Sequence, residues 1–246
     1  YINKAKEKGY DVLIMDGQLD SHLINHLESK FKESRFVRVD SDVVDKLIEK
    51  DEVIESKLSA VEQDNINSIF TSQLSAEDHF VVVSESMNES DAPVMITQSE
   101  FMRRMKDMSQ LGGGMNFYGD LPDSYNLVVN NNHPIIIELS GNLGEELGEK
   151  LTAHNKKIDK VKADKEKEEK TQSDKKEEEV TQAEKDKLEK LQKNITKYEE
   201  AKKADLTKFA DKKPIVKQLI DLALLSNNML KGEELNKFVK RSIELL

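Results

Sequence analysis

The chain has 246 residues, of which 37% are apolar and 35% charged, with a formal net charge of -10. It holds no cysteine, which excludes a disulfide scaffold, a thiolate metal site and a cysteine nucleophile. No run approaches the ~18 consecutive apolar residues of a membrane span, and no signal peptide precedes Tyr1. We therefore expect one or two domains of a cytoplasmic protein, forming an internal-to-C-terminal piece of a longer chain.

Charge is distributed unevenly along the chain. The segment 156–213 carries 19 Lys plus Arg and 16 Asp plus Glu in 58 residues, a net of +3. The other 188 residues hold 19 basic and 32 acidic side chains, a net of -13. A nearly balanced, very polar segment therefore interrupts an acidic globular sequence, and the acidic remainder argues against nucleic-acid binding.

The first residues predict a small α/β unit. A helix-like start ends at Gly9, which suits a helix C-cap, and the apolar run at 10–15 predicts a buried strand of a parallel sheet. Asp20-Ser21 can cap a helix, and 36–39 predicts a second strand. A strand, a helix and a strand in this order form a βαβ unit with a right-handed crossover.

A helical connector over 43–57 leads into a second unit. Its first helix spans about 61–74 and keeps its apolar residues on one side. Short apolar runs then predict three strands, at 79–83, 94–97 and 124–130. After the last strand, Asn131 or Asn132 caps a helix that has Pro134 in an early turn.

Methionine gathers in one part of this second unit, because five of the eight lie between 95 and 115. The predicted helix at 99–110 carries Phe101, Met105 and Met108 on one face. Such a face suits adaptable binding to unrelated partners, although on pattern alone the buried face of an amphipathic helix is the commoner outcome. An apolar segment without periodicity follows the helix, and it favours the binding interpretation. The candidate binding residues are Phe101, Met102, Met105, Met108, Leu111 and Met115.

The charged segment at about 143–210, called the arm below, predicts a helical hairpin. Apolar residues follow heptad spacing in two stretches, at 147–161 and 188–198. In an antiparallel pairing His154 faces Leu191, and the turn lies near 171–173. Two partly helical, poorly ordered stretches are the alternative.

The last part of the chain returns to a dense apolar pattern. A helix opens at Pro214 and is apolar around most of its circumference, and a break at 227–232 separates it from a final helix. Apolar residues of this kind need a cover, and a second copy of the chain is the simplest one. The candidate interface residues are Leu219, Leu222, Leu225, Phe238, Ile243 and Leu246.

Catalytic groups are sparse. His22 and His26 stand at metal-ligand spacing on one predicted helix, but no third ligand accompanies them, so a solvated helix face is the better interpretation. The glycines at 112–114 lack the Lys-Ser/Thr that follows a phosphate-binding loop. We therefore expect no catalytic residue, no metal site and no cofactor in this chain.

Several segments are similar, in order, to known motifs of one family: KGYDVLIM at 8–15, DAPVMIT at 91–97, SEFMRRM at 99–105, YNLVVN with His133-Pro134, QLIDLALL at 218–225 and FVKR at 238–241. Together they resemble the C-terminal half of the ninety-kilodalton heat-shock chaperones, in their bacterial form. Each motif is weak by itself, but the ordered set is fairly specific. The chain ends without the acidic tail of the cytosolic eukaryotic relatives, which favours a bacterial origin.

The resemblance implies an α+β architecture with two parts. Residues 1–57 would be the end of the middle domain, a small α/β/α unit. Residues 58–246 would be a mixed α/β dimerisation domain, with the arm as a helical-hairpin insertion that shorter family members lack. The two C-terminal helices of each subunit would form a four-helix bundle at the dimer contact.

The resemblance also implies a function. The longer protein would be an ATP-dependent chaperone, acting as a homodimer, with ATP and magnesium bound upstream of this piece. This piece would not be an enzyme, and it would supply the dimer contact and part of the surface that binds non-native client proteins. The alternative is a passive dimeric scaffold whose charged arm recruits a partner protein. Under both hypotheses we expect the chain to bind neither nucleic acid nor a membrane.

Overall fold

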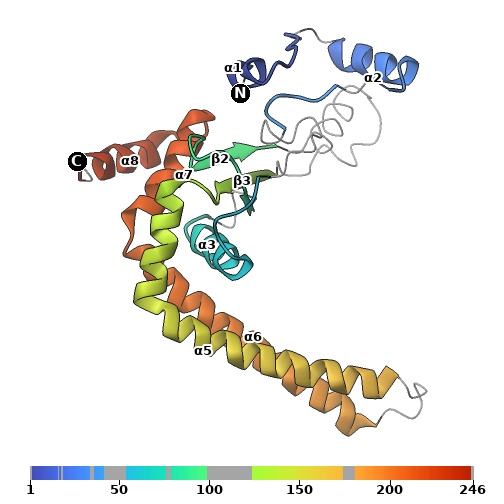
Figure 1. The fold of residues 1–246 in the computed structure, drawn as a ribbon, viewed down its shortest axis with the longest axis vertical. Helices are drawn as coiled ribbons and strands as arrows, with labels where there is room; N and C mark the ends of the chain where they lie inside the picture. Colours follow the sequence, from blue (N-terminus) through green and yellow to red (C-terminus); the bar gives the residue numbers. More distant parts are fainter. Residues whose placement is uncertain are drawn as a thin grey trace.

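The computed structural model describes residues 2–15, 17, 19–33, 36–41, 54–75, 79–98, 124–173 and 181–244. It has a mixed α+β body built around a small sheet, from which a long pair of helices projects (Figure 1). The expected mixed α+β class is confirmed.

Three strands form the sheet: β1 (Phe80–Glu85), β2 (Val94–Thr97) and β3 (Tyr125–Asn130). Their order is β1-β3-β2, with β1 parallel and β2 antiparallel to the central β3. Successive side chains of a strand point to opposite faces, so Leu127 and Val129 enter the main core while Val128 packs with Met87 on the other side. The three predicted strands are confirmed, each to within two residues.

Helix α3 (Ala60–Ser72) packs against this sheet, as predicted for 61–74. A capping box fixes its start, because the Ser59 hydroxyl accepts from the Glu62 N–H while the Glu62 carboxylate accepts from the Ser59 N–H. Ile66 and Phe70 are fully buried in the core. Truncating a side chain such as Phe70 to alanine costs about 3–5 kcal/mol.

The junction after β3 is held by an asparagine. Asn132 Oδ1 accepts from the Lys57 N–H at 2.8 Å, and its Nδ2 donates to the carbonyls of Glu55 at 3.0 Å and Met87 at 3.1 Å. This side chain is 3% exposed and joins three segments that are far apart in sequence.

The predicted helix cap at Asn131 or Asn132 is wrong. The next helix begins at Pro134, so His133 is the capping residue, and its carbonyl accepts from the Ile137 N–H at 3.1 Å. The His133 Nδ1 accepts from the Ile135 N–H at 3.2 Å, and burial lowers the pKa of this histidine. An imidazole can therefore serve where asparagine was expected, because its neutral form has a hydrogen-bond acceptor.

The predicted helical hairpin is confirmed. Helix α5 (Pro134–Ser173) has 40 residues, and α6 (Gln182–Asp211) has 30 and returns alongside it (Figure 1). The predicted turn near 171–173 is displaced, since α5 continues through Ser173 and α6 starts at Gln182. The two helices join the core at their base, where Leu151, Leu206 and Phe209 are buried.

The predicted register of the hairpin is wrong. His154 contacts Asp205, with 3.1 Å between His Nε2 and Asp Oδ2, instead of facing Leu191. From 191 to 205 is two heptads, so the same seam positions meet in both registers and periodicity cannot choose between them. Core packing at Leu206 and Phe209 makes the choice.

Two C-terminal helices follow, as predicted. Helix α7 (Pro214–Ser226) has Pro214 at its first position, where a missing N–H costs nothing. Helix α8 (Gly232–Glu244) follows a turn in which Asn228 has φ +56°, and its first residue, Gly232, has φ +59°. In Figure 1, α8 projects from the body on the side away from the tip of the hairpin.

The N-terminal region differs most from expectation. Helices α1 (Ile2–Glu7) and α2 (Asp20–Lys30) are present, but the strands predicted at 10–15 and 36–39 are wrong, since neither segment is a strand. Leu13 is 66% exposed. An apolar run becomes a strand only where neighbours satisfy its backbone groups, and two strands by themselves are marginal in water.

Two predicted helices lie wholly or largely outside the described residues. They are the Met-rich helix at 99–110 and the connector at 43–57, of which only 54–57 is described and is not helical.

Candidate functional site

The C-terminal helix pair leaves four large apolar side chains exposed. They are Leu222 (47%) and Leu225 (36%) on α7, and Val239 (47%) and Ile243 (67%) on α8. Residues three or four apart share one helix face, so each helix presents a short apolar stripe. We call these four residues the C-terminal apolar surface.

Helix α8 has two contrasting sides. Its sequence places apolar residues on one side and charged residues on the other at helical spacing. None of its residues is buried, so the apolar side is not covered within the chain. On the polar side, a hydrogen bond with Lys237 lowers the pKa of Glu234, and the same bond raises the pKa of Lys237. Such exposed pairs contribute little stability, so the apolar side is the part of α8 that a cover would stabilise.

The predicted interface residues fall into three groups. Leu222, Leu225 and Ile243 are exposed, and Phe238 is half-buried. Leu219 is instead 5% exposed within the core of its own chain, so it is not available to a partner. Leu246 lies outside the described residues. Val239 was not among the predicted interface residues, although it stands one helical turn before Ile243.

Polar side chains link α7 to α8. The Arg241 guanidinium donates to the Asp221 carboxylate, and Lys217 Nζ lies 3.3 Å from the second oxygen of that carboxylate. Gln218 Nε2 donates to Ser242 Oγ at 2.6 Å. Asp221 is 0% exposed. The sequence could have indicated a special role for Asp221, since it is a single carboxylate within the apolar run 219–225.

The candidate client-binding residues Phe101, Met102, Met105, Met108, Leu111 and Met115 all lie outside the described residues. The structure does describe both attachments of the segment that holds them. Thr97 ends β2 and pairs with Asn126 near the start of β3, so the segment leaves and returns at one end of the sheet.

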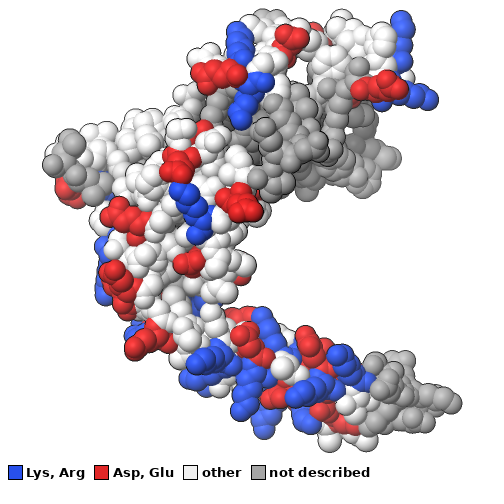
Figure 2. Space-filling model, viewed as in Figure 1, with Lys and Arg blue, Asp and Glu red and all other residues white. Residues whose placement is uncertain are grey.

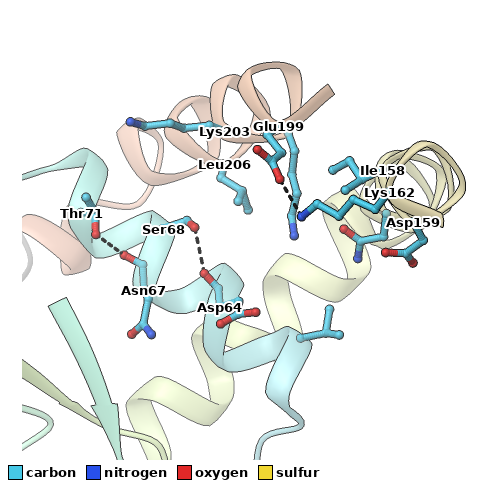
Figure 3. Close-up of a pocket in the computed structure, with 13 residues that line it drawn as sticks. Asp64, Asn67, Ser68, Thr71, Ile158, Asp159, Lys162, Glu199, Lys203 and Leu206 are labelled. Atoms are coloured by element: carbon cyan, nitrogen blue, oxygen red, sulfur yellow. Dashed lines mark hydrogen bonds and ion pairs between the residues drawn. The ribbon is translucent and has the colours of Figure 1, made fainter. Parts of the chain in front are cut away.

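A groove of about 640 Å3 lies between α3 and the base of the hairpin (Figure 3). On the hairpin side of the groove, Lys162 Nζ of α5 pairs with Glu199 Oε1 of α6 at 2.8 Å. Burial lowers the pKa of Lys202, which also lines the groove. The Ser68 and Thr71 hydroxyls donate to carbonyls of their own helix, so neither is prepared to act as a nucleophile. The groove therefore has mixed charge but no catalytic arrangement.

The surface of the arm is mainly charged (Figure 2). Figure 2 shows basic and acidic side chains interleaved along it, whereas the region over α8 on the same face is mostly uncharged. Among the described residues, no large apolar side chain of α5 or α6 is exposed. The described part of the arm therefore has no large apolar side chain that is exposed on its surface.

Metal and membrane sites were searched over the described residues alone. No group of three or more His, Cys, Asp or Glu side chains there could hold a metal ion. No described helix is both long and apolar enough to cross a membrane.

Comparison with known proteins places the chain in a family. Chaperone protein htpG of Bacteroides fragilis (strain YCH46) is 45% identical over 248 aligned residues, covering 100% of this chain and 36% of that protein. With the same coverage, Chaperone protein HtpG is 44% identical in Bacteroides thetaiotaomicron and 42% in Porphyromonas gingivalis. These alignments cover the whole chain, so they include the residues of the arm.

The chain thus spans about a third of the length of these relatives. No solved structure gives a significant match. The family model described as Hsp90 protein matches residues 1–156, which is more than half of the chain. The chain belongs to the Hsp90 protein family.

Proposed function

We propose that the chain is the C-terminal part of a homodimeric molecular chaperone, in which it supplies the dimer contact and part of the client-binding surface. The observation that carries the proposal is α8, an amphipathic helix without a buried residue beside the exposed leucines of α7. Relatives named as chaperones support it. ATP and magnesium would bind elsewhere in the longer protein, and this piece would hydrolyse no ATP.

The dimer contact would be symmetric, with α7 and α8 of each copy meeting in a four-helix arrangement. Its apolar centre would be the C-terminal apolar surface together with Phe238 and Leu246. A standard stable interface buries about 1,600 Å2, which two helices of 13 residues from each copy can supply in part. Light scattering of the chain tests this contact, and a monomer at micromolar concentration would refute it.

The client-binding surface would be the Met-rich segment. It is tethered at one end of the sheet, where apolar and adaptable side chains could meet unfolded proteins of any sequence. Its candidates remain Phe101, Met102, Met105, Met108, Leu111 and Met115.

Serine substitutions at Phe101, Met105 and Met108 test this surface. We expect the triple variant to lose suppression of aggregation of an unfolded client protein, while its dimer and its unfolding free energy stay close to wild type. Leucine at the same three positions is the matched control, because it keeps the apolar surface. If the helix is core instead, each serine costs about 2–5 kcal/mol and the variant unfolds, which would refute the client-binding role.

A further inference from the structure

We infer that the buried pair Asp221–Arg241 is a positioning device, which orients α8 on α7 so that its apolar stripe is turned towards a second copy of this chain. The inference rests on the proposed dimer and adds to it the residues that set its geometry. Asp221 and Arg241 are positioning residues, because they act on the dimer contact through α8.

Polar contacts attach α8 to α7. No residue of α8 is buried and its Phe238 is only half-buried, so apolar packing constrains the rotation of α8 about its own axis only weakly. The contacts that join it to α7 at named atoms are polar: Arg241 to Asp221 and to Gln218 Oε1 at 3.3 Å, and Gln218 to Ser242. Hydrogen bonds have strict geometry, so these links fix which side of α8 faces α7.

These contacts also set the direction in which the apolar stripe of α8 points. A helix turns by about 100° per residue, so Val239 and Ile243 lie roughly 200° from Arg241 around the axis. If Arg241 faces α7, those two residues must face away from it. Their exposures of 47% and 67% agree with that geometry.

Asp221 places a charge within the otherwise apolar part of α7. The Asp221 side chain is 1% exposed and that of Arg241 19%. A buried pair is often no more stabilising than an apolar pair of the same volume, but it is costly to separate. At this position it would hold one orientation of α8, because any rotation leaves the Asp221 carboxylate with Lys217 alone, at 3.3 Å.

The experiment compares three variants with the wild-type chain by analytical ultracentrifugation. Asp221→Leu with Arg241→Met removes both charges, so no buried charge is left unpaired. Arg241→Lys keeps the charge but not the two-pronged geometry. Lys237→Met is the matched control, because it removes a pair formed within α8 alone.

We expect the dimer dissociation constant to rise about tenfold or more for the double variant, and by a smaller factor for Arg241→Lys. The Lys237→Met dimer should match wild type. Hydrogen exchange of α3 and β3 should show an intact core in all of them. A double variant that dimerises like wild type would overturn the inference, and so would one that loses its core, because the pair would then be structural.

The two proposals can fail separately. If the wild-type chain is a monomer, the proposed dimer function fails and this inference fails with it. If the wild type is a dimer and the double variant keeps its affinity, only the positioning role fails.

Discussion

The dimer proposal makes its sharpest prediction at Leu222 and Ile243, one on each helix of the C-terminal apolar surface. Changing both to serine should dissociate the dimer while leaving the fold of each copy intact. The fold should survive because Leu222 is 47% and Ile243 67% exposed in the single chain. Their contacts within the chain are therefore limited, and surface substitutions usually change stability by less than about 0.5 kcal/mol.

The magnitude follows from the area that the partner would cover. Full burial of a leucine or isoleucine is worth about 1.5–3 kcal/mol, so covering the exposed half or two thirds gives about 1–1.5 kcal/mol each. A symmetric contact contains every residue twice, so the double substitution removes about 5 kcal/mol. Since about 1.4 kcal/mol is a factor of ten, the dissociation constant should rise more than about a thousandfold.

Sedimentation equilibrium over a range of concentrations measures this change, and urea unfolding of the monomeric variant checks the fold. Val81→Ser is the matched control, because Val81 is 52% exposed but lies on β1. The reasoning is refuted if the double variant stays dimeric with its wild-type dissociation constant. It is equally refuted if Val81→Ser dissociates the dimer to the same extent, because exposure alone would then explain the effect.

Three further predictions follow from the fold. Replacing 160–201 by a short Gly-Ser linker keeps the His154–Asp205 contact, and we expect the body to stay folded by circular dichroism and the chain to stay dimeric by mass. A body that unfolds would contradict this prediction. Loss of a bound partner alone would favour the scaffold alternative. Asn132→Ala should lower the urea-unfolding free energy by about 1–3 kcal/mol, because it orphans buried backbone groups, and a value unchanged from wild type would contradict this. Burial lowers the pKa of His133, so the folded state favours the neutral imidazole. The stability that neutral His133 contributes is present above its ordinary pKa of 6.5 and is lost as the pH falls below that value. The wild type should therefore lose stability relative to His133→Asn between about pH 8 and pH 5, and a stability difference that does not vary with pH would contradict the assignment.

Local patterns predicted most of the body correctly. The strands at 79–83, 94–97 and 124–130 were found because each is a short apolar run between turn residues, and its neighbours lie within this chain. Helices α7 and α8 were found because Pro214 and the break at 227–232 delimit them. These features depend on a few adjacent residues, which is why a single sequence contains them.

Features that depend on distant residues were missed. The strand at 10–15 failed because an apolar run does not reveal whether neighbouring strands are present to satisfy its backbone. The hairpin register failed because a heptad seam is invariant to a slip of two heptads. Asn132 was assigned to a local cap, but it binds residues 55 and 57 instead. The role of Asp221 depends on a partner twenty residues away.

The distribution of exposed apolar side chains distinguishes the two functional hypotheses, client binding by the body and partner binding by the arm. In the described residues, large exposed apolar side chains occur in the N-terminal region, at Val61 and Val81, and on α7 and α8, but not on α5 or α6. A protein held by the arm would therefore meet lysine and glutamate, and its binding should weaken as salt screens those charges. A client held by the Met-rich segment would be bound by apolar contact, which added salt does not weaken. Binding of an unfolded client that persists in about 0.5 M salt, where the Debye length is about 4 Å, would assign the client to the body. Salt-sensitive binding would assign it to the arm.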